Sequence, residues 1–161
     1  MLESAPARQL SDELLTVIRN VMRAGGGRFL AVLEEHALSM TTMKLLMILD
    51  ASEQELPVSK VAAQVGLSLA ATSRAVDDAV KRNLVSRTEA DYDRRVKLLA
   101  LTSQGSHLVE QINAARREGA DDFVARLTDE QCRDVSAALT PLLDLFAQIP
   151  DPTDKTEGTP A

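Results

Sequence analysis

The sequence predicts a mainly α-helical protein that carries one small β-hairpin. Apolar residues recur every three or four positions along most of the chain, whereas residues 84–101 show two short strand-like runs around a polar turn. With three Phe, one Tyr and no Trp, the core has to be built from Leu, Val, Ile, Ala and Met, which suits helices. A length of 161 residues fits one compact domain with short tails.

The segment from Ser68 to Asn83 has the composition of a helix that enters a DNA groove. Ser68 is a good N-cap, and Asn83 tolerates the left-handed backbone that ends helices. One face is small and apolar, while the other is small at its start and carries Arg74 further on. Slim residues, hydroxyls and an arginine near the N-terminal end suit the major groove. An ordinary amphipathic surface helix shows a similar pattern, so that interpretation stays open.

The following segment is predicted to form a hairpin. Strands are expected at Leu84–Thr88 and Val96–Leu101, joined by the polar turn Glu89–Arg95. The adjacent Arg94 and Arg95 contribute little to packing there, but they suit phosphates or a minor groove. An exposed charged hairpin without a binding role is the alternative.

Basic residues concentrate in this region although the chain as a whole is acidic. The net charge is −6, yet residues 59–97 contain eight Lys or Arg and five Asp or Glu, a local charge of +3. The distribution of charge matters more for DNA binding than its total. A short helix at residues 58–64, a glycine-containing turn, the helix from Ser68 and the hairpin together predict a winged helix-turn-helix over residues 40–101.

Several motifs resemble those of the MarR family of bacterial transcriptional regulators. They are Leu67–Asp77, Asn83–Arg87, Asp93–Arg95 and Leu101–Gly105, of which the last two are the most specific. The resemblance covers about residues 10–147 and departs from the family at Leu69 and Asn83, where proline and glycine are common. It implies a two-fold dimer whose terminal helices interlock.

Helical patterns flank the winged region, and residues 10–36 and 103–147 are predicted to form the dimerisation helices. The first helix is expected to begin near Leu10, capped by Ser11, and to end near Glu35. It should continue through Gly25–Gly27, because the apolar stripe keeps its phase across them, although three glycines would have to be held by close packing.

The remaining boundaries follow from caps and composition. Ser39 or Thr41 should cap a helix that ends at Asp50, and Thr102 should cap a long helix. The segment Thr128–Gln131 has the pattern of a capping box. Pro141 should kink the last helix. Residues 1–9 are expected to be a flexible N-terminus and residues 150–161 a disordered tail, which leaves 10–149 as a single domain.

The expected DNA-binding residues lie on the helix after Ser68 and on the hairpin. They are Ala70, Ala71, Thr72, Ser73, Arg74, Arg87, Asp93, Arg94, Arg95 and Lys97. The hydroxyls of Thr72 and Ser73 are expected at phosphates or base edges. Asp93 is expected to hold a wing arginine, and Lys81 to pair with Asp77 at i, i+4.

The predicted function is sequence-specific binding of double-stranded DNA, at a pseudo-palindromic operator, by a homodimeric transcriptional regulator that acts as a repressor. The resemblance also implies release by a small, often aromatic and anionic ligand. The candidate pocket residues are Arg19, Met22, His36, Met40, Met43 and Met47. These methionines would otherwise fill gaps in the core. A winged-helix dimer that serves as a protein-interaction scaffold without DNA binding is the alternative function.

Other classes of function lack support in the sequence. His36 and His107 have no second His or Cys at metal spacing, and no catalytic constellation is present, so we expect no enzyme, cofactor or metal site. The single cysteine, Cys132, excludes an internal disulfide and is expected to be a buried, inert thiol. No stretch is long and apolar enough to span a bilayer, and no signal peptide is recognisable, so a cytoplasmic protein is expected.

Overall fold

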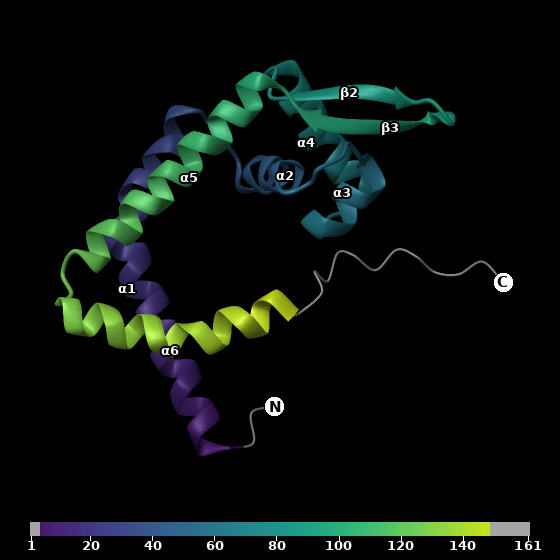
Figure 1. The fold of residues 1–161 in the computed structure, drawn as a ribbon. Helices are drawn as coiled ribbons and strands as arrows, with labels where there is room; N and C mark the ends of the chain where they lie inside the picture. The colour runs from purple at the N-terminus through teal and green to yellow at the C-terminus, as the bar shows by residue number, and fades with distance from the viewer. Residues whose placement is uncertain (1–3, 149–161) are drawn as a thin grey trace. The chain divides into compact units, whose positions relative to one another are not determined.

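The computed structural model describes residues 4–148 (Figure 1). Its contacts divide the chain into two compact units. Unit 1 contains the N-terminal segment up to His36 together with Gln111–Leu139, and unit 2 contains Ala37–Glu110 together with the chain from Thr140. In chain order the elements are α1 (Ala5–Glu35), α2 (Met40–Asp50), β1 (Leu56–Pro57), α3 (Val58–Val65), α4 (Leu69–Lys81), β2 (Val85–Ala90), β3 (Asp93–Leu101), α5 (Ser103–Val124) and α6 (Asp129–Gln148). The predicted fold, mainly helical with a small antiparallel hairpin, is confirmed. The predicted tail at 150–161 lies outside the described residues.

The first helix begins earlier than its sequence suggested. Ser4, not Ser11, caps α1, because the Ser4 hydroxyl accepts from the Ala7 N–H at 3.4 Å. Pro6 then occupies the first turn, where its missing N–H costs nothing. Residues 5–9, predicted to be flexible, therefore belong to the helix.

The glycine run does not interrupt α1, as the phase of its apolar stripe predicted. Close packing is not the reason at Gly26 and Gly27. A Cβ added to Gly26 or Gly27 would meet nothing within 4 Å. The helix hydrogen bonds of a 31-residue element continue across the glycines, although each glycine costs up to about 1 kcal/mol relative to alanine.

Polar contacts join α1 to α5 within unit 1. Arg28 lies 2.8 Å from Asp122 and 3.4 Å from Glu118, and the Arg116 guanidinium stands 5.2 Å from the centre of the Phe29 ring. All three ion-pair partners are about half exposed, so each pair contributes at most about 1 kcal/mol.

The predicted capping box precedes α6. The Thr128 N–H donates to Gln131 Oε1 at 2.9 Å, and the Gln131 N–H donates to Thr128 Oγ1 at 3.2 Å. The described part of α6 contains Pro141 and has no buried residue. Cys132, predicted to be buried, is half-buried.

The core of unit 2 forms where α2, α3 and α4 pack together and against the sheet. Most of its fully buried side chains are apolar, among them Leu45, Leu46, Val61, Val76, Ala79 and Leu99. Of the two predicted caps, Ser39 and Thr41, it is Ser39 that starts α2, accepting from the Thr42 N–H at 3.0 Å.

The sheet has the strand order β1-β3-β2 and is antiparallel throughout. β1 was not predicted from the sequence, because two residues beside a proline carry no strand pattern; Leu56 pairs with Leu99 and is buried. Pairing of β2 with β3 begins at Val85 opposite Leu101 and shifts register between Glu89 and Ala90.

Candidate nucleic-acid interface

The turn before α4 and the start of that helix have the geometry of a helix-turn-helix. Gly66 ends α3 in the left-handed conformation, at φ 78°, which glycine adopts without steric cost. Ser68 caps α4 as predicted, with its hydroxyl 3.2 Å from the Ala71 nitrogen. Asn83 ends the segment at φ 56°, also as predicted. The uncompensated N–H groups of the first turn of α4 favour an anion such as a phosphate.

The exposed face of α4 is small at its N-terminal end and basic one turn later. Ala70 and Arg74 are exposed, and Ala71 and Ser73 are half-buried. Thr72 is different.

Thr72 belongs to the core of unit 2 and was wrongly predicted as a DNA contact. Its side chain is 1% exposed, and its hydroxyl donates to the Ser68 carbonyl at 3.1 Å. A hydroxyl that is buried and already bonded cannot reach a phosphate. The signal was present in the sequence, because Thr72 shares a face with the buried Val76 and Ala79.

Two basic residues of the strands are held in ion pairs. Arg87 on β2 lies 2.7 Å from Asp77 of α4, and Lys97 on β3 pairs with Glu89 on β2. Asp77 therefore pairs with Arg87 and not with Lys81, its predicted partner. Ion pairs this exposed are worth about 1 kcal/mol or less, so a phosphate could displace the carboxylate at small cost. Phosphate contacts by Arg87 and Lys97 stay predictions.

The hairpin of β2 and β3, which we call the wing, has a shorter turn than predicted. β2 ends at Ala90 and β3 begins at Asp93, so Arg94 and Arg95 lie on β3 and not in the turn. The predicted turn of seven residues reduces to Asp91 and Tyr92 because Glu89 still pairs across the sheet with Lys97.

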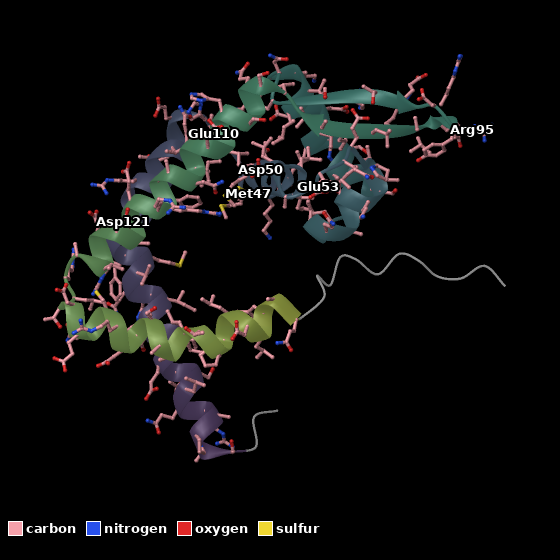
Figure 2. All side chains as sticks on the ribbon, viewed as in Figure 1. Met47, Asp50, Glu53, Arg95, Glu110 and Asp121 are labelled. Carbon is pink, nitrogen blue, oxygen red and sulfur yellow. The ribbon has the colours of Figure 1, made fainter. Side chains whose placement is uncertain are left out.

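The wing arginines remain available to a ligand. Both are exposed, and Figure 2 places Arg95 at the outer end of the hairpin. Within residues 4–148, neither guanidinium has an ion-pair partner, and the same holds for Arg74. Asp93 does hold a wing arginine, but through the backbone: its carboxylate accepts from the Arg95 N–H at 2.9 Å.

A compact junction fixes the end of α4, the base of the hairpin and the start of α5. The Thr102 hydroxyl donates to the Asn83 carbonyl at 2.6 Å and accepts from the Gly105 N–H at 3.0 Å, while the Thr102 N–H donates to the Leu84 carbonyl at 3.1 Å. Gly105 lies against the Leu84 backbone, where a Cβ would approach the carbonyl oxygen to 2.0 Å. The Leu-Thr-x-x-Gly motif therefore acts as the clamp that positions the wing relative to α4.

The predicted ligand residues do not share one environment. Met43 is 5% exposed and fills the core of unit 2, which is the ordinary use of methionine, whereas Met22 and Met40 are largely exposed. Arg19 bonds to the Thr16 hydroxyl of its own helix, and His36 is half-buried.

A cavity of about 790 Å³ opens in unit 2 beside the C-terminal end of α2. Met47 lines this cavity together with the 51–57 segment, Lys60 and Gln64. The sequence did not predict its other walls, because they come from a loop whose path is set by the pairing of β1.

No helix between residues 4 and 148 combines the length and apolarity needed to cross a membrane. Over the same residues, no group of three or more His, Cys, Asp or Glu side chains is placed to hold a metal ion.

A helix-turn-helix followed by a basic two-stranded wing defines the winged-helix class of DNA-binding domains. Residues 38–97, the core of unit 2, match the model of the MarR family. Over these residues the chain is similar to the MarR family.

Individual proteins show a similar relationship. The chain is 24% identical over 115 residues to the HTH-type transcriptional regulator PapX of Escherichia coli, covering 71% of this chain and 70% of PapX. It is 32% identical over 76 residues to the HTH-type transcriptional repressor MdtR of Bacillus subtilis, covering 47% and 49%, which is about half of each protein. The crystal structure of RV1404 from Mycobacterium tuberculosis is similar with a TM-score of 0.74 and 25% identity, covering 93% of this chain and 99% of RV1404.

Proposed function

We propose that this protein is a homodimeric repressor that binds a pseudo-palindromic DNA duplex in a sequence-specific manner, with one α4 in each half-site. The observation that carries the proposal is the joint exposure, within unit 2, of a slim N-terminal face on α4 and of three arginines without ion-pair partners among the described residues.

On α4, Ala70 and Ala71 add little bulk beyond the backbone, so the helix can approach the floor of a major groove. Arg74, one turn after Ala70, is long enough to reach a guanine edge or a phosphate from that position. Ser73, half-buried beside it, offers a hydroxyl to the same region. The position of α4 in the groove therefore sets which base pairs the protein faces, and Arg74 supplies the strongest candidate contact.

On the wing, Arg94 and Arg95 extend the positive surface away from α4. Arginine is favoured where a narrow minor groove concentrates negative potential. Because Asp93 is engaged with the Arg95 backbone N–H, its carboxylate helps to fix the strand without neutralising either guanidinium through an ion pair.

The dimer is supported by apolar residues that remain exposed on α1 and α6. On α1 the stripe includes Leu10, Leu14, Ile18 and Met22, each at least 40% exposed. On α6 Val135, Leu139, Leu143 and Phe146 form a second stripe, each at least 44% exposed. Large apolar side chains arranged along a helix face are typical of an interface that a second chain covers.

The protein is further proposed to repress transcription and to release DNA when a small ligand binds. MdtR, with which the chain shares 32% identity over the matched segment, is named a transcriptional repressor. Release by a small aromatic acid is tested directly by adding such compounds to the preformed protein–duplex complex.

The first experiment selects duplexes from genomic fragments with the full-length protein and measures binding across a range of salt concentrations. Specific binding should weaken steeply with salt, because phosphate contacts release counterions. Arg94→Ala and Arg95→Ala should each cost about 1 to 3 kcal/mol of binding free energy. Each should also lower the steepness of log affinity plotted against log salt concentration, the salt slope, by about 1. Arg117→Ala, an exposed arginine of α5 in unit 1, is the matched control.

Tyrosine emission gives a second, local measurement on the same samples. Tyr92 is the only tyrosine of a chain without tryptophan and is 77% exposed in the turn of the wing. Its emission should change when the wing meets DNA. Unchanged affinity in both arginine variants, with unchanged emission, would remove the wing from the interface. Failure of the unaltered protein to bind any duplex at low salt would instead favour the protein-interaction scaffold.

A further inference from the structure

Arg82 is a basic residue beside the DNA-binding face for which the sequence suggested no role. It directly follows α4, and its N–H donates to the Asp78 carbonyl at 3.1 Å. Its side chain is 29% exposed, whereas those of Arg74, Arg94 and Arg95 are exposed. Arg82 is therefore held against the protein more closely than the arginines expected to meet DNA.

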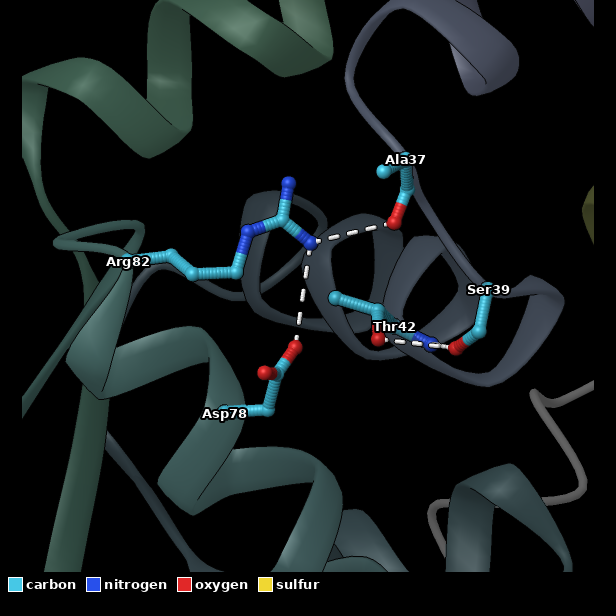
Figure 3. Close-up of polar contacts among 5 residues, drawn as sticks. All are labelled: Ala37, Ser39, Thr42, Asp78 and Arg82. Carbon is cyan, nitrogen blue, oxygen red and sulfur yellow. Dashed lines mark hydrogen bonds and ion pairs between the residues drawn. The ribbon is translucent and has the colours of Figure 1, made fainter.

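The Arg82 guanidinium bridges two segments that are distant in sequence (Figure 3). Its Nη1 atom donates to the Ala37 carbonyl at 3.3 Å and lies 3.7 Å from a carboxylate oxygen of Asp78. Nη1 carries two N–H groups, so this one atom can serve the Ala37 carbonyl and the Asp78 carboxylate together, and the planar guanidinium holds it in a fixed direction that a rotating lysine ammonium does not. Its position after the last turn of α4 also places a cation where the helix dipole favours one.

The carbonyl that Arg82 holds belongs to a strained connection between α1 and α2. Ala37 has φ 43°, a left-handed conformation that is unfavourable for a residue with a Cβ. Such a conformation persists where its neighbours fix it. Directly after Ala37 in the chain, Leu38 is 9% exposed, and Ser39 caps α2 with its hydroxyl 2.8 Å from that of Thr42.

We propose that Arg82 is a positioning residue that ties the C-terminal end of α4 to the connection before α2 and so sets the angle at which α4 meets DNA. The 13 residues of α4 span about 20 Å. A tilt of about 5° at one end of such a helix moves the other end by nearly 2 Å, more than a hydrogen bond tolerates. Arg82 thereby controls affinity without touching the duplex.

The inference rests on the proposed duplex binding, and its test separates the two. Arg82→Gln and Arg82→Lys are compared with Lys81→Gln, which removes one positive charge from the exposed neighbouring residue. Two quantities are measured: affinity for a fluorescein-labelled duplex, selected by the unaltered protein, at several salt concentrations, and hydrogen exchange of residues 38–43 in the DNA-free protein.

Arg82→Gln should weaken duplex binding about tenfold, leave the slope of affinity against salt unchanged, and speed exchange at residues 38–43. Arg82→Lys should fall between Arg82→Gln and the unaltered protein, because the ammonium keeps the positive charge but its flexible side chain holds the two contacts less firmly. Lys81→Gln should leave exchange in that segment unchanged. Thermal melts identify the temperature at which every variant is folded, and Arg82→Lys carries the test alone if Arg82→Gln does not fold.

Two results would overturn the proposal. A salt slope lower by about 1 in Arg82→Gln, with exchange unchanged, would make Arg82 a phosphate contact. If Arg82→Gln bound the duplex with unchanged affinity and residues 38–43 exchanged at an unchanged rate, Arg82 would have no positioning role. If the unaltered protein bound no duplex, the proposed function would fail, while unchanged exchange in the DNA-free variants would still refute the tether.

Discussion

A single methyl group added at Gly105 should damage the junction that holds the wing. A Cβ at this position would lie 2.0 Å from the Leu84 carbonyl oxygen, 3.0 Å from the Leu84 carbonyl carbon and 3.3 Å from a methyl group of Leu101. Separations under 3 Å to backbone atoms are not tolerated in a close-packed structure, so the start of β2 or of α5 has to shift by about 1 Å.

The cost of Gly105→Ala can be worked from the contacts around it. Overpacking of this kind costs about 1 to 3 kcal/mol. The shift also strains the two hydrogen bonds that Thr102 makes to the carbonyls of Asn83 and Leu84, at about 1 kcal/mol each. Alanine in a helix regains about 1 kcal/mol relative to glycine. The net loss of unfolding free energy should be about 2 to 4 kcal/mol.

Urea unfolding followed by circular dichroism measures this loss, at one fixed protein concentration because dimerisation contributes to stability. The matched control is Gly27→Ala in α1, where a Cβ meets nothing within 4 Å. This control should gain about 0.5 to 1 kcal/mol from helix propensity alone. If both variants changed stability alike, the close approach of Leu84 to Gly105 would not exist in solution.

Three further substitutions test other parts of the structure. Ala37→Gly should raise the unfolding free energy by about 0.5 to 1 kcal/mol, because it relieves the left-handed alanine at φ 43°; a loss in the same urea titration would contradict that backbone conformation. Thr72→Val removes a buried hydroxyl bonded to the Ser68 carbonyl and should cost about 1 kcal/mol of stability while leaving duplex affinity unchanged in fluorescence titrations, whereas a loss of affinity would restore Thr72 to the interface. Leu143→Lys should shift the protein from dimer to monomer in sedimentation, because Leu143 is 63% exposed on the apolar stripe of α6, and Ala137→Lys on the same helix should not; equal behaviour of the two would argue against this stripe as the interface.

Elements governed by local chemistry were predictable from the sequence. The caps at Ser68 and Thr128 were correctly placed, and Ser39 was one of two predicted candidates, because each cap depends on a hydroxyl within three residues of the N–H that it serves. The uninterrupted first helix followed from the phase of its apolar residues. Its true start was missed because Ser4 and Ser11 are both acceptable caps, and the helix takes the earlier one.

Errors at the candidate site arose where a partner is remote in sequence. The wing turn was predicted too long, because the pairing of Glu89 with Lys97 extends the ladder beyond the strand-like residues. Asp77 pairs with Arg87 across ten residues instead of with Lys81 across four, since β2 brings the arginine to the side of α4.

By itself, the sequence determined the order of the helices, the single hairpin, the basic charge of the DNA-binding region and the positions of its arginines. These depend on periodicity, capping and composition, which act within a few residues. Only the tertiary structure decided which polar residues are free to bind. It buried Thr72, paired Arg87 and Lys97 with carboxylates, left Arg94 and Arg95 exposed, and joined Arg82 to a carbonyl 45 positions away. The physical reason is that a side chain's hydrogen-bond partner is set by proximity in space, which folding creates between segments that no local pattern relates.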